Sequence, residues 1–284
     1  MALYLKGKKL ADSKVISVGG KYNIEVIDKF DEYGNKYQTL NITDWDYLPY
    51  DRVFGNNTPA HISAVSAEIA KKKYTSEQVA EIYGWNLGDT IPITLSSGEN
   101  IEMQIIGINH DTLSSDHTSK AGLTLQMKEC LATKYPMNSS STNAGGYAAS
   151  KMKNETLPTI KALLPQEWQD VIKLVDKKSA NGGSSNYSET LTLSEDLFLL
   201  SEIEIFGTAI RAEDSVNEGS QYEYWNGKTA ADRIKKYSPT VTIHWWLRSS
   251  AYYITSYFIT VNTSGDNYAS DAKNPYGISF AFCV

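Results

Sequence analysis

The last part of the chain, residues 245–284, combines side chains that suit contact with another molecule. Tyrosines alternate there with short polar residues, and the mixture is dominated by Tyr, Ser, Asn and Asp. Tyr offers a large contact area with few rotatable bonds, while Ser and Asn supply adaptable hydrogen bonds, as in antibody loops. The residues that we expect to contact a ligand are Tyr252, Tyr253, Thr255, Ser256, Tyr257, Ile259, Asp266, Asn267, Tyr268, Ser270, Asp271, Asn274 and Tyr276. Composition alone does not separate such a binding face from the Tyr-rich surface of an ordinary β-domain.

Two stretches of a different kind flank these residues. One is residues 245–249, and the other is residues 277–284, where apolar side chains alternate and predict a strand tied into a core. Residues 222–225 are compatible either with the edge of the binding face or with the core. Large side chains beside a binding loop usually hold it rigid. The residues that we expect to form the scaffold of the site are Trp245, Trp246 and Arg248.

Catalytic chemistry finds little support in the residue pattern. Cys130 and Cys283 are the two cysteines, far apart in sequence and without metal-ligand spacing, so we expect both to be buried and reduced. The chain has no Gly-x-Ser-x-Gly elbow, phosphate-binding loop or His-Glu-x-x-His motif. We therefore expect no catalytic residue, no cofactor and no enzymatic activity.

Two weak metal-site patterns have simpler structural explanations. His110, Asp111, Asp116 and His117 gather imidazoles and carboxylates within a few residues, but turn and scaffold hydrogen bonds explain them as well. Residues 266–267 and 274–275 faintly resemble a Ca²⁺ site of lectins, although Asn and Asp in turns give the same pattern. No metal ligand is therefore assigned.

Regular elements that would position the binding face are readable upstream. Thr58-Pro59 opens a helix with apolar residues at helical spacing, and a second helix begins at Thr75, which forms a capping box with Gln78, and ends at Gly84. Residues 91–95 and 100–108 predict a hairpin with one buried face.

Later segments give more mixed signals. Residues 144–175 predict helix broken by prolines, and residues 196–200 and 204–206 predict short core strands or their flanks. Residues 263–266 predict a hairpin turn between two strands of the binding region.

The whole chain suggests a folded protein of more than one part. Its 284 residues, with 41% hydrophobic and 21% charged residues, are typical of a globular protein. We expect a β-rich attachment or oligomerisation region at 1–57, a helical connector at 58–84 and a ligand-binding domain at 85–284. The net charge of −6 disfavours nucleic acid as a partner. Lysines interrupt the N-terminus before a signal-peptide core could form, and no apolar run predicts membrane insertion.

A set of separated motifs, in order, resembles one family between about residue 75 and residue 284. The chain is similar to a domain common in gut bacteria and their phages, whose members include variable proteins of diversity-generating retroelements. The motifs are GDT at 88–90, IGINHD at 106–111, MNSS at 137–140, LLP at 163–165, FLLSE at 198–202, GSQYEY at 219–224, WWLRS at 245–249 and GISFAFCV at 277–284.

This resemblance implies an α+β, C-type-lectin-type fold, in the branch shared with formylglycine-generating enzymes. In such systems an error-prone copy of a template repeat replaces the 3′ end of the gene, and altered Asn codons yield Tyr, Ser, Asp, Thr or Ile. Those residue types are the ones found between the two flanking stretches. The enzyme relatives use paired cysteines near each other in sequence, which this chain lacks.

The function that follows is ligand binding through a diversified surface. We expect a phage tail or virion-associated adhesin, made in the bacterial cytoplasm, that recognises a protein or glycan of a bacterial surface. Several weak contacts gain from multivalency, so we expect a homo-oligomer, such as a trimer. The alternatives are a bacterial structural or interaction protein on the same scaffold without diversification and an oxidase of the formylglycine-generating type.

Overall fold

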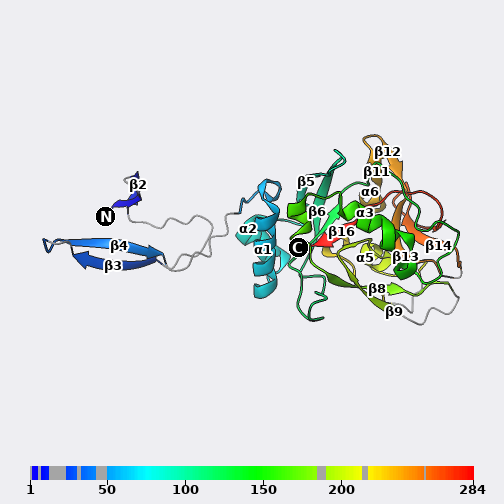
Figure 1. Ribbon diagram of the computed structural model, residues 1–284, viewed down its shortest axis with the longest axis horizontal. Helices are drawn as coiled ribbons and strands as arrows, with labels where there is room; N and C mark the ends of the chain where they lie inside the picture. Colours follow the sequence, from blue (N-terminus) through cyan, green and yellow to red (C-terminus); the bar gives the residue numbers. More distant parts are fainter. Residues whose placement is uncertain are drawn as a thin grey trace. The chain divides into compact units, whose positions relative to one another are not determined.

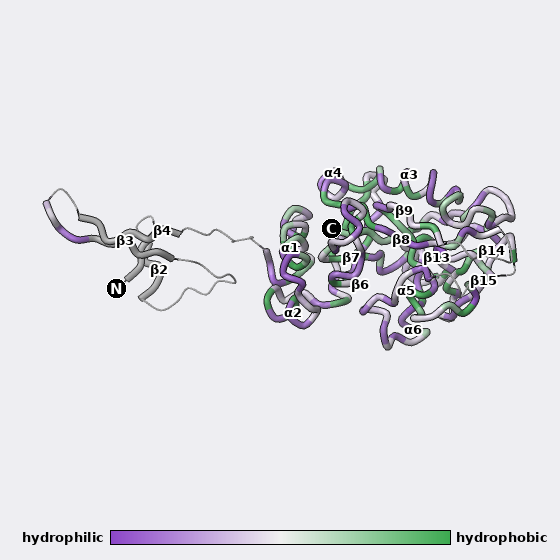
Figure 2. The backbone as a smooth tube through the Cα atoms, turned by 90° about the horizontal axis from the view of Figure 1, so that it is seen from below, coloured by the Kyte–Doolittle hydropathy of each residue, from purple (hydrophilic) through white to green (hydrophobic). Residues whose placement is uncertain are grey.

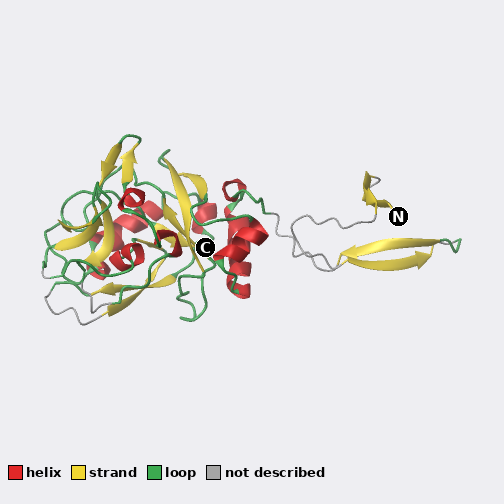
Figure 3. Ribbon diagram, turned by 180° about the vertical axis from the view of Figure 1, so that it is seen from behind, coloured by secondary structure: helices red, strands yellow, loops and turns green. Residues whose placement is uncertain are grey.

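A computed structural model describes residues 2–5, 8–12, 24–30, 33–42, 50–183, 190–212, 217–252 and 254–284. The chain divides into an N-terminal unit, Met1–Tyr50, and a C-terminal unit, Asp51–Val284. Helices and strands are intermixed throughout the C-terminal unit (Figure 1 and Figure 3). The expected mixture of α and β structure is therefore confirmed.

The described strands of the N-terminal unit form two antiparallel hairpins. β1 (Ala2–Leu5) pairs with β2 (Lys8–Asp12), and β3 (Ile24–Phe30) pairs with β4 (Lys36–Ile42). Gly34, in the turn between β3 and β4, has a φ of +80°, a conformation that glycine adopts without steric cost.

The first helix of the C-terminal unit, α1 (Pro59–Lys72), begins as the sequence predicts. The Thr58 side chain accepts a hydrogen bond from the His61 N–H at 3.3 Å, and Pro59 occupies the first helical turn. Apolar residues recur at helical spacing and face inward, so hydrophilic and hydrophobic colours alternate along α1 in Figure 2. The buried apolar positions are Ile62, Val65 and Ile69.

The second helix, α2 (Ser76–Tyr83), has the predicted caps. Thr75 and Gln78 form the capping box, and Gly84 ends the helix in the left-handed conformation. Both helices belong to the same compact unit as the rest of the chain from residue 51. We expected them to connect that part of the chain to a separate N-terminal region.

The largest sheet has the strand order β10-β16-β7-β6-β5, with antiparallel pairing throughout. The predicted hairpin is confirmed as β5 and β6. The last strand in sequence, β16, lies inside this sheet, between β10 and β7, and its side chains are fully buried. The strands are β5 (Thr90–Thr94), β6 (Asn100–Ile108), β7 (Leu123–Met127), β10 (Leu197–Phe198) and β16 (Ala281–Cys283).

Smaller sheets complete the described strands of this unit. β13, β14 and β15 form a three-stranded antiparallel sheet, while β8 pairs with β9 and β11 with β12. Their bounds are β8 (Val175–Ala180), β9 (Thr190–Glu195), β11 (Lys235–Ser238), β12 (Val241–Ile243), β13 (Trp245–Ser250), β14 (Tyr257–Val261) and β15 (Asn267–Asp271).

Short helical segments connect the sheets. The segment predicted as helical, residues 144–175, contains η2, η3, α3 and α4, but its end at Val175 is the start of β8. The short helices are η1 (Phe54–Asn56), η2 (Tyr147–Ala149), η3 (Met152–Thr156), α3 (Leu157–Lys161), α4 (Gln166–Gln169), α5 (Glu202–Phe206), η4 (Glu223–Trp225) and α6 (Ala230–Arg233).

Residues 204–206, predicted as a short core strand or the flank of one, are not a strand. Residues 204–206 belong to α5, because Ser201 and Glu204 form a capping box and Gly207, with a φ of +80°, ends the helix. In the part of the chain that the structure describes, no helix has the length and apolar character needed to cross a membrane.

Candidate functional site

The segment predicted to bind a ligand begins and ends at one place in the core. The Trp246 N–H donates to the Gly277 carbonyl oxygen at 3.1 Å, and the Gly277 N–H donates to the His244 carbonyl oxygen at 2.9 Å. A Cβ atom at Gly277 would lie 2.7 Å from the Cys130 sulfur, so this approach requires glycine. Residues 247–276 are therefore an excursion whose two ends are hydrogen-bonded to each other.

Most of this excursion is a β-hairpin. β14 pairs with β15 with Tyr257 opposite Asp271 and Thr260 opposite Tyr268. The predicted turn is confirmed, since the Asn262 N–H donates to the Asp266 carbonyl oxygen at 2.8 Å and Gly265 has a φ of +81°. The Tyr268 side chain at the start of β15 is 47% exposed.

Two of the residues expected on the binding face do not reach the surface. Ile259 is completely buried, and Ser270 is 3% exposed. β14 is the middle strand of its sheet, so β13 and β15 pair with its two edges, and residues 258–261 are buried on both faces. The Ser270 hydroxyl lies 3.4 Å from that of Thr260, between the paired strands. Both residues are corrected to parts of the support, the name used below for the buried residues beneath the expected binding face.

The other expected contact residues keep some access to solvent, apart from Tyr253, which lies outside the described residues. Tyr252 packs against the buried Ala180. Thr255, Asp266 and Tyr268 are exposed; the partly buried set is Tyr252, Ser256, Tyr257, Asn267, Asp271, Asn274 and Tyr276. We define these ten residues as the tyrosine face.

Aromatic rings hold part of the tyrosine face in place. The Tyr276 ring stacks on His244 with centroids 5.0 Å apart, and the Tyr268 ring meets the edge of His244 at 5.5 Å. Trp246 lies 5.2 Å from Tyr276, and the Arg211 guanidinium lies 5.9 Å from the Tyr268 ring centroid. Burial lowers the pKa of His244, which favours the neutral form of this ring. Packed rings of this kind lose little entropy when they bind.

A buried asparagine fixes the loop between β13 and β14. The Asn143 side-chain amide donates to the carbonyl oxygens of Ile254 and Tyr257 at 3.0 and 2.9 Å. Its backbone N–H donates to the Thr255 carbonyl oxygen at 2.7 Å. Asn143 is completely buried, and the sequence analysis did not single it out.

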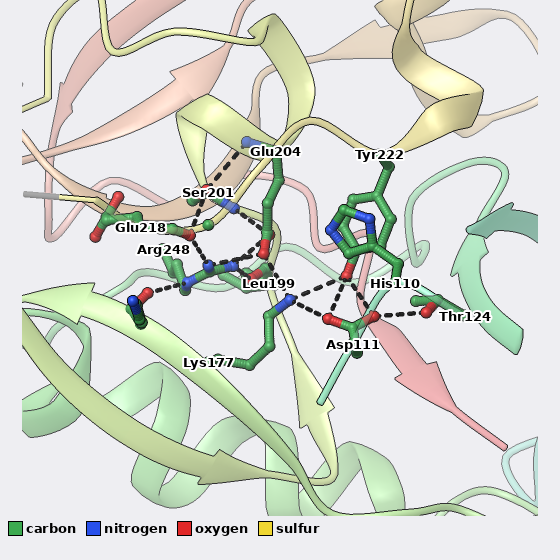
Figure 4. A network of polar contacts seen from close by, with 12 residues as sticks. His110, Asp111, Thr124, Lys177, Leu199, Ser201, Glu204, Glu218, Tyr222 and Arg248 are labelled. Atoms are coloured by element: carbon green, nitrogen blue, oxygen red, sulfur yellow. Dashed lines mark hydrogen bonds and ion pairs between the residues drawn. The ribbon is translucent and has the colours of Figure 1, made fainter. Parts of the chain in front are cut away.

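Arg248, on β13, is the centre of a buried polar network under the same sheet (Figure 4). Its guanidinium donates to both carboxylate oxygens of Glu204, one of them at 2.9 Å, and to the Glu218 carbonyl oxygen at 2.6 Å. It also donates to the carbonyl oxygens of Lys178 and Leu199, each at 2.9 Å. The five donors of a guanidinium are thus engaged, as a fully buried arginine requires.

A second cation, Lys177, continues the network. Its ammonium donates to Asp111 at 2.7 Å and to the Tyr222 hydroxyl at 2.9 Å, and it forms an ion pair with Glu204. Burial raises the pKa of Asp111, but Lys177 and His110 outweigh burial and hold that pKa below its usual range. Burial likewise opposes ionisation of Glu204, whose pKa Arg248 and Lys177 lower. The two buried cations therefore face two ionised carboxylates.

Glu218 differs from these carboxylates. Burial raises its pKa, although the Arg248 charge and hydrogen bonds oppose this effect. The carboxylate group accepts from the Ser249 hydroxyl and from the Ala180 N–H at 2.9 Å. Glu218 thereby connects β13 to β8.

Glu202, the first residue of α5, connects the support to the tyrosine face. Its carboxylate accepts from the backbone N–H groups of Ile210 and Ala212 at 2.9 and 2.8 Å, and from the Asn267 side-chain amide at 2.8 Å. Its own N–H donates to the Ser249 hydroxyl at 2.9 Å. Glu202 therefore contacts β13 through its backbone N–H, and the loop of residues 210–212 and β15 through its carboxylate.

Residues considered as metal ligands are used in hydrogen bonds and packing. His110 stacks on Tyr222 with centroids 4.0 Å apart. His117 lies 2.7 Å from Asp176, and Asp116 accepts from two N–H groups of its own loop. Among the residues with described positions, no group of three His, Cys, Asp or Glu residues could hold a metal ion.

The tryptophans expected to form the scaffold are in the core, and so are some of the residues that the sequence left between the binding face and the core. Trp245 and Trp246 are completely buried. Tyr222 and Trp225 are also buried, which removes them from the edge of the tyrosine face. Tyr224 is partly buried and packs edge-on against Trp225 at 4.9 Å.

Comparisons with known proteins give one finding. A family model described as "Domain of unknown function (DUF6273)" matches residues 121–284, which is more than half of the chain and includes the tyrosine face. No curated protein and no solved structure matches the chain significantly.

Proposed function

The chain belongs to the DUF6273 family of domains of unknown function, and from that premise we propose that it is a ligand-binding protein whose tyrosine face is diversified by a retroelement. The observation that carries the proposal is the closed base of residues 247–276. Because His244, Trp246 and Gly277 bond the two ends together, the side chains of the tyrosine face can change while the base keeps its geometry.

The residue types on the face support this proposal further. Tyr, Ser, Thr, Asn and Asp provide anchors and adaptable hydrogen bonds, which is the composition of antibody loops. The underlying residues have the opposite character, since Trp245, Trp246 and Arg248 are completely buried. A variable surface on an invariant support is what repeated diversification requires.

The finer assignment of the fold belongs to the same proposal. We propose a C-type-lectin-type fold, of the branch shared with formylglycine-generating enzymes. The mixture of short helices with several small sheets and the insertion of β16 between β10 and β7 are compatible with it. The motif order in the sequence is the main support.

The biological role we propose is that of a phage tail or virion-associated adhesin, made in the bacterial cytoplasm, that recognises a bacterial surface protein or glycan. Tyr268 and Tyr276 would be aromatic anchors, surrounded by polar residues such as Asp266 and Asn274. Multivalent display by a homo-oligomer, such as a trimer, would raise the affinity without new contacts.

An oxidase function has less support. Burial raises the pKa of Cys130 to about 12, and burial also raises the pKa of Cys283 far above its ordinary value. A thiol with a raised pKa is a poor nucleophile, because the thiolate is the reactive form. We therefore propose a non-enzymatic function.

The gene itself provides the decisive test. Sequencing of the locus should find a reverse transcriptase gene and a near-repeat of the 3′ coding region that differs at adenines. Parallel cultures should then accumulate substitutions at the codons of the tyrosine face, while codons for Trp245, Trp246 and Arg248 stay unchanged. A locus without the repeat, or substitutions spread evenly over both sets of codons, would exclude diversification and favour an interaction protein with a fixed surface.

Ligand binding is tested separately on the purified full-length protein with a glycan array and with host cells. A variant with Tyr268→Ala and Tyr276→Ala should lose the signal, whereas a matched variant with Tyr33→Ala, an exposed tyrosine of the N-terminal unit, should keep it. Equal signals from the two variants would place the binding site outside the tyrosine face.

A further inference from the structure

A second surface feature of the C-terminal unit lies away from the tyrosine face. A cavity of about 1020 Å³ opens between α1 and the loop that joins β6 to β7, with Val284 also in its wall. In Figure 1 and Figure 2, α1 and the sheet of β13, β14 and β15 lie at opposite ends of this unit. The cavity is therefore separate from the proposed binding face.

Buried contacts fix the walls of this cavity. The Ser66 hydroxyl, on α1, accepts from the Leu123 N–H at 3.0 Å and donates to the Val284 carbonyl oxygen. A Cβ atom at Gly122 would lie 2.0 Å from the Ser66 carbonyl oxygen, so any other residue there would push α1 away. Asn109 donates to the Tyr74 carbonyl oxygen at 2.8 Å and holds the end of the helix. The space is thus built into the packing of α1.

The charged side chains of the lining are all of one sign, in a chain whose net charge is −6. Lysines from three separate segments line the cavity, and no Asp or Glu side chain does. Lys120 donates to the His110 carbonyl oxygen and the Thr112 hydroxyl, both neutral acceptors. Within the described part of the chain, none of these lysines has a carboxylate partner. The four are Lys71, Lys73, Lys120 and Lys173.

The nearest acidic side chain of the loop does not cancel this charge. The Asp116 carboxylate accepts from the N–H groups of Thr118 and Ser119 at 2.9 and 2.8 Å and from the Ser119 hydroxyl. It is bound within its own loop and does not line the cavity. Cations gathered around a concave surface that acidic side chains do not line raise the local concentration of anions.

We propose that this cavity binds a small organic ligand with two or more negatively charged groups, phosphates or carboxylates. Its size is that of a cavity for one small molecule. The lysines would contact the charged groups, while Ala67, Ala70 and Leu113 provide apolar contacts for the remainder of the ligand. The proposal is independent of the tyrosine face and of its diversification.

Isothermal titration calorimetry of the full-length protein tests the proposal, with tripolyphosphate and citrate as separate probes at low salt, where screening is weak. We expect saturable binding of one equivalent of at least one probe, and the stronger probe identifies phosphate or carboxylate as the preferred group. The double variant Lys71→Gln, Lys73→Gln should bind about tenfold more weakly.

The control carries the same loss of charge outside the cavity. Lys72 lies on α1 between the two cavity lysines, and Lys178 lies on β8; both are exposed and neither lines the cavity. The double variant Lys72→Gln, Lys178→Gln should keep the wild-type affinity to within about twofold. A further variant, Ala67→Trp, fills the cavity without changing charge and should abolish binding, with thermal melting to verify that it is folded.

Two results would overturn the proposal. One is the absence of saturable binding of either probe to the wild-type protein. The other is an equal loss of affinity in the two double variants, which would mean that the anions respond to net charge alone. Neither result bears on ligand binding at the tyrosine face.

Discussion

At the scale of single residues, Glu202 matters most because its carboxylate contacts the support and the tyrosine face at once. In Glu202→Gln one acceptor oxygen becomes an NH2 group, which cannot accept from the N–H groups of residues 210–212 or from Asn267. We expect a loss of about 1–3 kcal/mol in the free energy of unfolding, measured by urea denaturation. Glu155→Gln removes an exposed carboxylate and is the control; equal effects of the two substitutions would contradict the role given to Glu202.

Arg248 should show the cost of breaking a buried ion pair. Arg248→Met leaves Glu204 buried beside one remaining cation, Lys177, and leaves several carbonyl oxygens without a donor. The expected loss is about 3–5 kcal/mol. The double variant Arg248→Met, Glu204→Leu should recover part of it in the same denaturation experiment, since it removes the uncompensated charge. A double variant less stable than the sum of both single effects would refute this explanation.

Asp111 makes stability depend on pH in a defined direction. Its pKa in the folded protein lies below the unfolded value of about 4, so its contribution is fully present above that value and is lost as the pH falls below it. The stability difference between wild type and Asp111→Asn should therefore narrow between pH 5 and pH 3, about the range of ordinary carboxyl titration. Thermal melting across this range measures it, and a constant difference would mean that the pKa of Asp111 is the same in the folded and the unfolded protein.

At the scale of elements, the β14–β15 hairpin carries exposed side chains that contribute little to stability and buried side chains that stability requires. Tyr268→Ala should lower stability by no more than about 0.5–1 kcal/mol, because the side chain is half exposed. Ile259→Ala, on the neighbouring strand, should cost about 2–5 kcal/mol because it leaves a cavity. Denaturation of the two variants checks this contrast. Similar losses would show that the tyrosine belongs to the core.

Elements specified by nearby residues could be predicted from the sequence. The capping box of Thr75 and Gln78, the end of α2 at Gly84 and the turn of residues 263–266 depend on side chains a few positions apart. The helix at residues 204–206 was missed although its signal is also local, because the Ser201 cap was not recognised. Three apolar or acidic residues alone do not distinguish a short helix from a strand.

The support of the site could not be predicted, because its partners are distant in sequence. Lys177 meets Asp111 across 66 positions, and Asn143 meets Tyr257 across 114. Ile259 was misassigned to the surface, since alternation alone cannot show that a strand will be the central one of its sheet. Residue types did indicate the exposed part of the face, because polar and tyrosine side chains carry that information locally.

At the scale of the whole molecule, the C-terminal unit has its own core. Within Asp51–Val284, buried apolar residues run from Phe54 to Val284 and form its core. A fragment of residues 51–284 should therefore unfold cooperatively at a temperature close to that of the full chain. Differential scanning calorimetry checks this, and a fragment without a cooperative transition would mean that the N-terminal unit is required for folding.

The position of β16 also makes folding depend on an intact reading frame through the tyrosine face. This strand is translated after the whole tyrosine face, yet it lies between β10 and β7, so the largest sheet cannot close until it has left the ribosome. A nonsense or frameshift change anywhere in residues 247–276 removes β16 and leaves the edges of β7 and β10 unpaired. Such chains would be open to proteolysis. A substitution on the tyrosine face leaves β16 in place, whereas a nonsense or frameshift change removes it.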